Sequence, residues 1–263
     1  MSQVKESEWA EQWDLLNEHM ENEGFLFQEW IKPNTLSDFN GKEVLDGGCG
    51  AGEHMNLVLP YVKKIVGVDF NPSQKLRSRF KNVSKAKVLE ADLAHMNLNK
   101  KFDMVYSIGV LHHTENPSTS FNNLVRHVKK GGRLIIWVYS YEGNFLNRTL
   151  LEFFKKYGLL KLSKSTLYKV AWLVTALLYL PIYTIYKLPL TFLPFYEYFD
   201  NWRKLTFKRN LLNVFDKMNA PTTHFIDGRT VRGWFDARRF KSVHISPYKG
   251  VSWRASGTKI ESR

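Results

Sequence analysis

The chain has 263 residues, enough for one α/β domain with an insertion of fewer than about a hundred residues, and its single cysteine, Cys49, excludes an internal disulfide. The formal net charge of +13 lies in the C-terminal part: residues 1–140 hold 17 basic and 17 acidic residues, whereas residues 141–263 hold 21 and 8. Unless these basic residues form only a solvated surface, they predict attraction to phosphates of lipid headgroups, nucleic acid or a phosphorylated substrate.

The first predicted element is a helix over residues 5–30, with Trp9, Trp13, Leu16 and Met20 three or four positions apart. We expect residues 1–40 to form a helical cap, in which Trp9 and Trp13 either close over a bound cofactor or anchor the helix on the core. The charged N-terminus has no apolar stretch and is not expected to be a secretory signal.

Strands and helices alternate between residues 41 and 140. Apolar runs predict strands at 43–46, 64–69, 86–90, 102–107 and 132–139. Helices are predicted near 52–59, 72–81 and 118–129, and the last should stop at Lys129-Lys130-Gly131-Gly132. This alternation predicts a parallel sheet covered by helices on both faces.

Residues 141–228 differ in composition and are predicted to form an apolar, basic helical insertion. Residues 167–186 contain one charged residue, Lys169, and are long enough to span a membrane as a helix. Pro181, several tyrosines typical of an interface, and basic residues at both ends argue against a simple span. A lid over the acceptor site, a dip into a cytoplasmic membrane leaflet and a dimer contact remain open.

Residues 229–263 are predicted to complete the sheet. Residues 229–239 have the pattern of an amphipathic helix, and residues 240–247 and 251–259 have the pattern of two final strands.

The first predicted strand runs directly into a glycine-rich turn, Gly47-Gly48-Cys49-Gly50-Ala51-Gly52-Glu53. Such a turn lets a ligand approach the backbone closely, because no Cβ atoms stand in the way. The turn lacks the third glycine of the dinucleotide fingerprint, and Glu53 at the helix start would oppose a phosphate. A cofactor without phosphate is therefore favoured.

Carboxylates stand at the ends of the first three predicted strands. Asp69 follows Gly52 by 17 residues, where such folds use an acid to accept hydrogen bonds from ribose hydroxyls. Asp92 is placed to accept from an adenine amino group, and Asp46 to lie beside an ammonium group. Each acid alone would be explained as a helix cap or turn former, but together they fit a ligand with adenosine at one end and a cation at the other.

In order and spacing, VLDGGCGAGE, VGVDFNP, EADL and FDMVYSIGVLHHTENP resemble the motifs of class I S-adenosylmethionine (SAM)-dependent methyltransferases, closest to the branch of the ubiquinone and menaquinone enzymes. The resemblance covers about residues 40–140. It implies a Rossmann-like α/β sheet with a C-terminal antiparallel strand at 251–259, SAM as the cofactor, and no metal. The positions implied to bind SAM are Asp46, Gly48, Cys49, Gly50, Gly52, Asp69, Phe70, Ala91, Asp92, Leu93, Ser107, Ile108 and Gly109.

Methyl transfer requires alignment of donor and acceptor and, for an O–H or N–H acceptor, removal of a proton. His112 and His113 follow the fourth predicted strand, where they act as a base, orient the acceptor, or only pack against the cofactor and cap the next turn. Tyr139 and His224 are further candidates for contact with the acceptor, and a surface loop is the alternative for His224.

We therefore expect a cytoplasmic enzyme that transfers a methyl group from SAM to a small-molecule or lipid-linked acceptor, with oxygen favoured as the acceptor atom. Peripheral contact with an anionic membrane at its inner face, and a homodimer, remain open. The alternatives are RNA methylation, supported by the basic C-terminal half and its aromatic residues, and SAM binding without catalysis.

Overall fold

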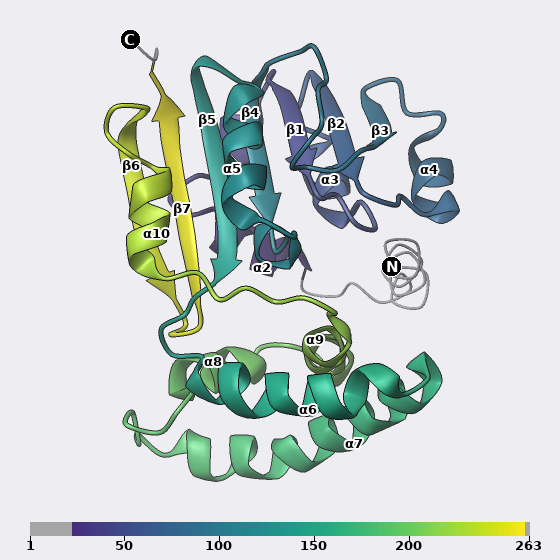
Figure 1. Ribbon diagram of the computed structural model, residues 1–263, viewed down its shortest axis with the longest axis vertical. Helices are drawn as coiled ribbons and strands as arrows, with labels where there is room; N and C mark the ends of the chain where they lie inside the picture. The colour runs from purple at the N-terminus through teal and green to yellow at the C-terminus, as the bar shows by residue number, and fades with distance from the viewer. Residues whose placement is uncertain (1–22, 261–263) are drawn as a thin grey trace.

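Seven strands form one sheet in the order β3-β2-β1-β4-β5-β7-β6 in the computed structural model, which describes residues 23–260 (Figure 1). Their bounds are β1 Glu43–Gly47, β2 Lys64–Asp69, β3 Ala86–Glu90, β4 Phe102–Ile108, β5 Val128–Tyr139, β6 Phe240–Tyr248 and β7 Ser252–Lys259. The first five strands are parallel, and β7 runs antiparallel to both β5 and β6. The predicted Rossmann-like sheet with a C-terminal antiparallel strand is confirmed.

Helices cover both faces of the sheet, because each face is apolar. They are α2 Glu23–Ile31, α3 Glu53–Val58, α4 Gln74–Phe80, α5 Pro117–Arg126 and α10 Gly228–Trp234. On one face, Phe121 of α5 and Trp234 of α10 belong to a core that includes Leu45 and Val105 of the sheet. On the other face, α2, α3 and α4 contribute buried side chains such as Phe27 to a second core.

Two predicted helix ends are wrong. α5 ends at Arg126 rather than at Lys129, because Val128 is fully buried and pairs with Phe102 at the start of β4. α10 ends at Trp234 rather than at residue 239. Asp236 forms a turn there, in which its carboxylate accepts from the Arg238 amide at 2.7 Å and its carbonyl from the Phe240 amide at 2.9 Å.

A helical layer, here the described residues from 144 to 219, lies across the carboxyl ends of β4 and β5 (Figure 1). Its elements are η3 Asn147–Leu151, α6 Glu152–Tyr157, η4 Leu159–Lys161, α7 Lys164–Tyr183, η5 Ile185–Lys187, α8 Tyr196–Trp202 and α9 Phe207–Asn219. α7 packs on α9 in a separate apolar core that includes Leu167, Ala171 and Phe215. Within residues 23–260, α7 is the one helix that is long and apolar enough to cross a membrane by length and composition.

The predicted N-terminal helix is described only from Glu23 onward, as α2. Trp9 and Trp13, predicted to close over the cofactor or anchor the helix, lie outside the described residues.

Candidate functional site

The glycine-rich turn between β1 and α3 is fixed against the end of β2. The amides of Gly48 and Cys49 donate to the carbonyl oxygen of Val68 at 2.7 and 3.0 Å, and the amide of Gly50 donates to the Asp69 carboxylate at 2.8 Å. Gly48 has φ +89°, and a Cβ at this position would lie 2.4 Å from the methyl groups of Val110. Both the backbone conformation and the close approach therefore require glycine at position 48.

Two other residues of this turn serve internal packing. A Cβ at Gly52, which has φ +82°, would lie 2.6 Å from side-chain atoms of Leu76 and Phe80 in α4. The thiol of Cys49 is buried against Gly67, and burial raises its pKa well above the ordinary value. Only the backbone of Cys49 is therefore available to a ligand at the turn.

Asp46 lies at the end of β1 and is almost completely buried. Its carboxylate accepts a hydrogen bond from the hydroxyl of Tyr106 at 2.9 Å. Burial raises the pKa of Asp46 to about 7, although His54 and the Tyr106 hydroxyl act in the opposite direction. A cationic group placed beside Asp46 would stabilise the ionised form, so the geometry suits the ammonium group expected from the sequence.

Asp69 closes β2, and its carboxylate accepts from the amides of Gly50 and Asn71 at 2.8 and 3.4 Å. Burial raises its pKa, and these backbone donors oppose the shift. A carboxylate has about four acceptor sites, so Asp69 can hold the turn and still accept from ribose hydroxyls. The neighbouring Phe70 is 52% exposed and offers a flat ring beside this position.

The segment after β3 runs next to Asp69. Ala91 donates its amide to the carbonyl oxygen of Asp69 at 2.9 Å, and Leu93 is buried. The Asp92 carboxylate accepts from the Ala94 amide at 2.9 Å and contacts Nδ1 of His95 at 2.7 Å. Asp92 thus stabilises a local turn, as expected for an acidic residue at the end of a strand. It also lies near the position predicted for the adenine.

The end of β4 connects the glycine-rich turn to β5. Ser107 is fully buried and donates its hydroxyl to the carbonyl oxygen of Gly47 at 2.7 Å. Ile108 is buried, and Gly109, with φ +80°, donates its amide to the carbonyl oxygen of Trp137 at 3.0 Å. The predicted cofactor positions therefore gather at the carboxyl ends of β1, β2, β3 and β4, around the glycine-rich turn, with the buried carboxylate of Asp46 and the partly buried carboxylate of Asp69.

His112 lies in the short helical turn η2, Leu111–His113, and is completely buried. Its Nδ1 faces the backbone amide of Tyr139 at 3.4 Å, and the two rings are 4.1 Å apart between centroids. An amide can only donate, so the neutral imidazole carries its proton on Nε2, and this atom has no hydrogen-bond partner in the described part of the chain. Burial, with His113 and His224 nearby, holds the pKa of His112 well below its usual range.

The other two histidines lie beside His112. Nδ1 of His113 is 2.8 Å from the carbonyl oxygen of Thr222, which can only accept, so His113 carries a proton on Nδ1. Burial lowers the pKa of His113, and Asp216 opposes this shift. His224 is half-buried and donates its amide to the carbonyl oxygen of His112 at 2.7 Å, which places it inside the cluster and not on a surface loop.

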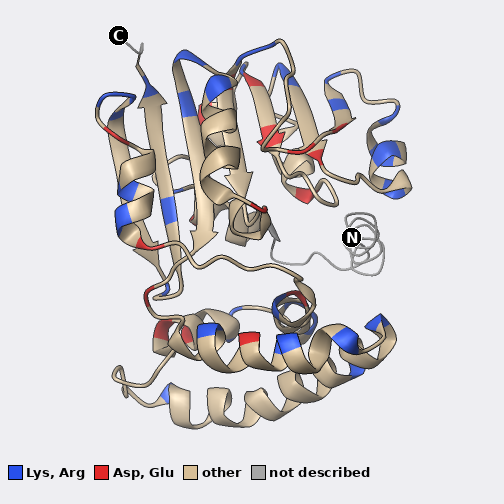
Figure 2. Cartoon of the chain, viewed as in Figure 1, with Lys and Arg blue, Asp and Glu red and all other residues tan. Residues whose placement is uncertain are grey.

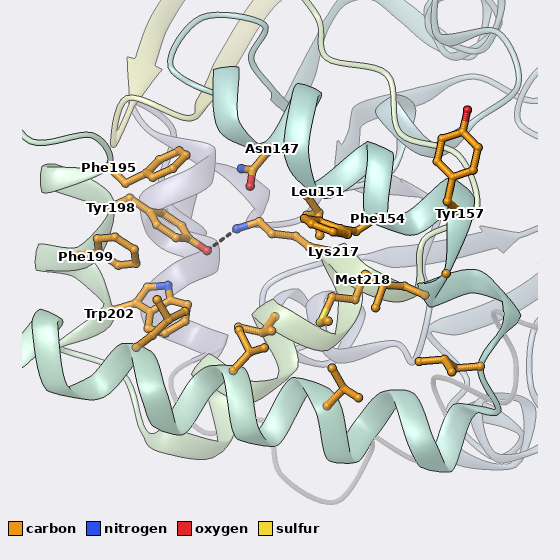
Figure 3. Close-up of a pocket in the computed structure, with 17 residues that line it drawn as sticks. Asn147, Leu151, Phe154, Tyr157, Phe195, Tyr198, Phe199, Trp202, Lys217 and Met218 are labelled. Atoms are coloured by element: carbon orange, nitrogen blue, oxygen red, sulfur yellow. Dashed lines mark hydrogen bonds between the residues drawn. The ribbon is translucent and has the colours of Figure 1, made fainter.

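Lys217 and Tyr198 complete this cluster, and neither is predicted by the sequence pattern. Lys217 of α9 donates to the hydroxyl of Tyr198 of α8 (Figure 3). The Nζ of Lys217 lies 5.9 Å from the ring centroid of Tyr139. Within residues 23–260, Lys217 forms no ion pair. The spacing of Leu211, Phe215 and Met218 would have predicted α9, but not that its lysine reaches the end of β5.

An apolar groove of about 760 Å³ lies in the helical layer and leads to Lys217 (Figure 3). Its walls come from α6 and α7, its floor from α9, and one end from α8. The residues that line it include Leu151, Phe154, Val170, Val174, Leu178, Tyr198, Trp202, Val214, Lys217 and Met218. A smaller space shares Tyr198, Trp202 and Lys217 with the groove and continues to Tyr139 and Trp137 of β5.

Comparison with known proteins agrees with this arrangement. Residues 45–136 match the family described as "Methyltransferase domain". The chain contains a SAM-dependent methyltransferase domain. The match is to the methyltransferase domain as a whole and assigns it to no ubiquinone or menaquinone branch.

Among curated proteins, the chain is similar to tRNA U34 carboxymethyltransferase of Haemophilus influenzae. The two are 33% identical over 109 residues, which cover 38% of this chain and 33% of the relative. The protein of the same name from Idiomarina loihiensis is 29% identical over 138 residues, 46% of this chain and 42% of the relative. The chain thus spans about a third to two fifths of the length of these relatives.

Solved structures share the fold over nearly the whole chain. The N-methyltransferase NodS from Bradyrhizobium japonicum WM9, in complex with S-adenosyl-L-homocysteine, has a TM-score of 0.54 at 12% identity and covers 97% of this chain and 100% of its own. Magnesium protoporphyrin IX methyltransferase from Synechocystis PCC 6803 has a TM-score of 0.54 at 13% identity, with 98% and 100% covered. At sequence identities of 12% and 13%, the similarity to these two structures establishes a shared fold only.

Proposed function

We propose that the protein transfers a methyl group from SAM to an oxygen atom of a small or lipid-linked acceptor that carries an apolar tail and an anionic group. SAM supplies an electrophilic methyl group on a sulfonium, whose sulfur leaves as the thioether of S-adenosylhomocysteine. The proton of an acceptor hydroxyl would pass to His113, whose Nε2 holds the ring's lone pair because its proton lies on Nδ1. The chain's own residues bind and orient both partners and keep water out.

The SAM-binding residues are those gathered at the ends of the first four strands. In this proposal the turn from Gly48 to Gly52 approaches the cofactor through its backbone, and Asp69 accepts from the ribose. Phe70, Asp92 and Leu93 address the adenine, and Asp46 pairs with the ammonium group. The buried carboxylate of Asp46, the partly buried carboxylate of Asp69, and the turn backbone that Asp69 holds at the end of β2 support this assignment.

The observation that carries the acceptor proposal is the apolar groove that ends at Lys217. An aliphatic or isoprenoid tail in this groove would remove apolar surface from water, at roughly 25 cal/mol per Å² of buried area. The polar end of such an acceptor would then point toward Tyr139 and His112.

Lys217 supports an anionic group on the acceptor. Its ammonium group is half-buried and, among residues 23–260, its one hydrogen-bond partner is the neutral hydroxyl of Tyr198. A partly buried cation without an acidic partner attracts a carboxylate or phosphate more strongly than an exposed lysine does.

His112 is completely buried and lines neither the groove nor the smaller space, so we assign it a positioning role behind Tyr139. Its Nδ1 faces the Tyr139 amide at 3.4 Å, and its ring lies 4.1 Å from the ring of Tyr139, which does line the smaller space. Its lowered pKa keeps the imidazole neutral, so it does not repel the positive charge of the sulfonium.

A second candidate function is modification of RNA, because the curated relatives are named as tRNA enzymes. The excess of basic residues in the C-terminal half also favours it. The groove is aliphatic along α7, with Val170, Val174 and Leu178, and aromatic along α6 and α8. The aliphatic side favours a tail over a nucleotide.

Incubation with isotopically labelled SAM, a bacterial lipid extract and total tRNA in separate reactions distinguishes the two functions. We expect label in the organic-solvent-soluble fraction and formation of S-adenosylhomocysteine. Label in tRNA alone would support the second candidate, and SAM binding without S-adenosylhomocysteine in either reaction would contradict both.

A further inference from the structure

The helical layer exposes two stripes of large apolar side chains. On η3 and α6, Leu150, Phe153, Phe154 and Tyr157 are each 55–57% exposed and stand at helical spacing. On α7, Leu173, Leu177 and Leu180 are 54%, 66% and 73% exposed and share one side of the helix. Apolar surface concentrated in this way is uncommon on a monomer that meets only water.

The opposite side of α7 is used inside the protein. Leu167, Ala171 and Ile182 are buried in the core shared with α9. This packing holds α7 along the layer, so its exposed leucines form a face rather than a helix that leaves the protein.

Basic residues surround the apolar stripes. Residues 161–190 contain four lysines, Lys161, Lys164, Lys169 and Lys187, and no acidic residue. Figure 2 shows basic residues near both ends of α7. Apolar side chains bordered by lysines match the chemistry of a bilayer surface with anionic headgroups, where the lysines contact phosphates and the leucines enter the acyl boundary.

We propose that this membrane-docking face, formed by the exposed side chains of residues 150–157 and 173–180 with the four lysines, binds the surface of an anionic lipid leaflet. Charge favours a leaflet over a second copy of the chain, because a symmetric contact would bring two lysine-rich faces together. Phe154 and Tyr157 of the first stripe also line the apolar groove, so the groove borders this face.

The test of the membrane-docking face is independent of the proposed methyl transfer, because vesicle binding is measured without SAM or acceptor. The full chain is sedimented with two kinds of vesicle. One contains phosphatidylcholine alone, and the other also contains about 40% phosphatidylglycerol, which makes its surface anionic. We expect binding to the anionic vesicles that is at least roughly tenfold tighter than to neutral ones and that weakens as salt is raised.

Two variants test the two parts of the face. Leu177→Glu with Leu180→Glu should weaken vesicle binding roughly tenfold or more, whereas Val243→Glu, on exposed β6, should leave it unchanged. Lys161→Gln with Lys164→Gln and Lys169→Gln should remove most of the preference for anionic vesicles, whereas Lys63→Gln with Lys64→Gln and Lys81→Gln should not. Circular dichroism and SAM affinity verify that each variant is folded.

Absence of sedimentation with anionic vesicles would overturn the proposal. So would equal affinity for neutral and anionic vesicles, or vesicle binding that the Leu177 and Leu180 variant leaves unchanged. A dimer in analytical ultracentrifugation that this variant dissociates, without vesicle binding, would instead show that the face is covered by a second copy.

Discussion

The backbone amide of His224 donates a hydrogen bond to the carbonyl oxygen of His112, with 2.7 Å between the two atoms. This bond joins the segment that follows the helical layer to the turn that follows β4. Lys155 of α6 adds a second connection, because its buried ammonium group donates to Thr223 at 3.2 Å and to Glu152 at 2.7 Å. The helical layer is therefore fixed over the end of the sheet where the cofactor positions gather.

Gly48→Ala should lower SAM affinity and stability together. The new methyl group would meet Val110 at 2.4 Å, and φ +89° is strained for any residue with a Cβ. We expect the free energy of unfolding to fall by about 1–3 kcal/mol, measured by urea denaturation, and SAM binding to be lost in calorimetry.

The control for Gly48 is Gly233→Ala in α10, where a Cβ meets nothing within 4 Å. It should keep SAM affinity and change stability by less than about 1 kcal/mol, in the stabilising direction. Normal SAM binding by Gly48→Ala would show that the turn does not approach the cofactor.

SAM affinity should rise with pH because of Asp46. Burial raises the pKa of this carboxyl to about 7, so at pH 6 most of it is protonated and must release its proton before it can pair with an ammonium group. We expect an increase of about eightfold in the association constant between pH 6 and pH 7.5, followed by calorimetry.

In Asp46→Asn this group no longer titrates, so the affinity should be lower and nearly constant over the same range. A pH dependence that Asp46→Asn retains would assign the effect to another group, such as Asp69, whose pKa is also raised by burial.

Lys217→Met should weaken use of an anionic acceptor while leaving SAM affinity unchanged. The variant keeps the length of the side chain and removes the positive charge beside Tyr198. We expect transfer of labelled methyl into the lipid extract to fall roughly tenfold at limiting extract, as for loss of a charged hydrogen bond. Lys85→Met, at an exposed position between α4 and β3, should behave like the original protein.

The strands were predictable because each is an apolar run between polar segments. The gathering of the predicted cofactor positions at one edge of the sheet was predictable because glycines and acids follow those strands in order. The end of α5 was not predictable from the sequence. The helix stops before the basic and glycine residues Lys129-Lys130-Gly131-Gly132, because Val128 already pairs with Phe102 in the sheet. Pairing across a sheet depends on the tertiary structure, which a helix-end pattern does not include.

The acceptor side of the site was predictable only in part. His112 and His113 follow β4 and Tyr139 ends β5, so the strand pattern places them at one edge of the sheet, whereas Lys217 has no local pattern that relates it to β5. It reaches Tyr139 because α9 packs on α7 and crosses the end of the sheet. The partner of Asp46, Tyr106, lies 60 residues further along the chain, and only the structure joins them.

The most direct test of the proposed function is to fill the groove. Val174→Trp places an indole on the wall formed by α7, and Val243→Trp places one on exposed β6, away from the groove and the membrane-docking face. With labelled SAM and a lipid extract, Val174→Trp should bind SAM normally but transfer methyl groups at least roughly tenfold more slowly, whereas Val243→Trp should retain its rate. Equal transfer by Val174→Trp and Val243→Trp would contradict the proposal that the acceptor occupies this groove.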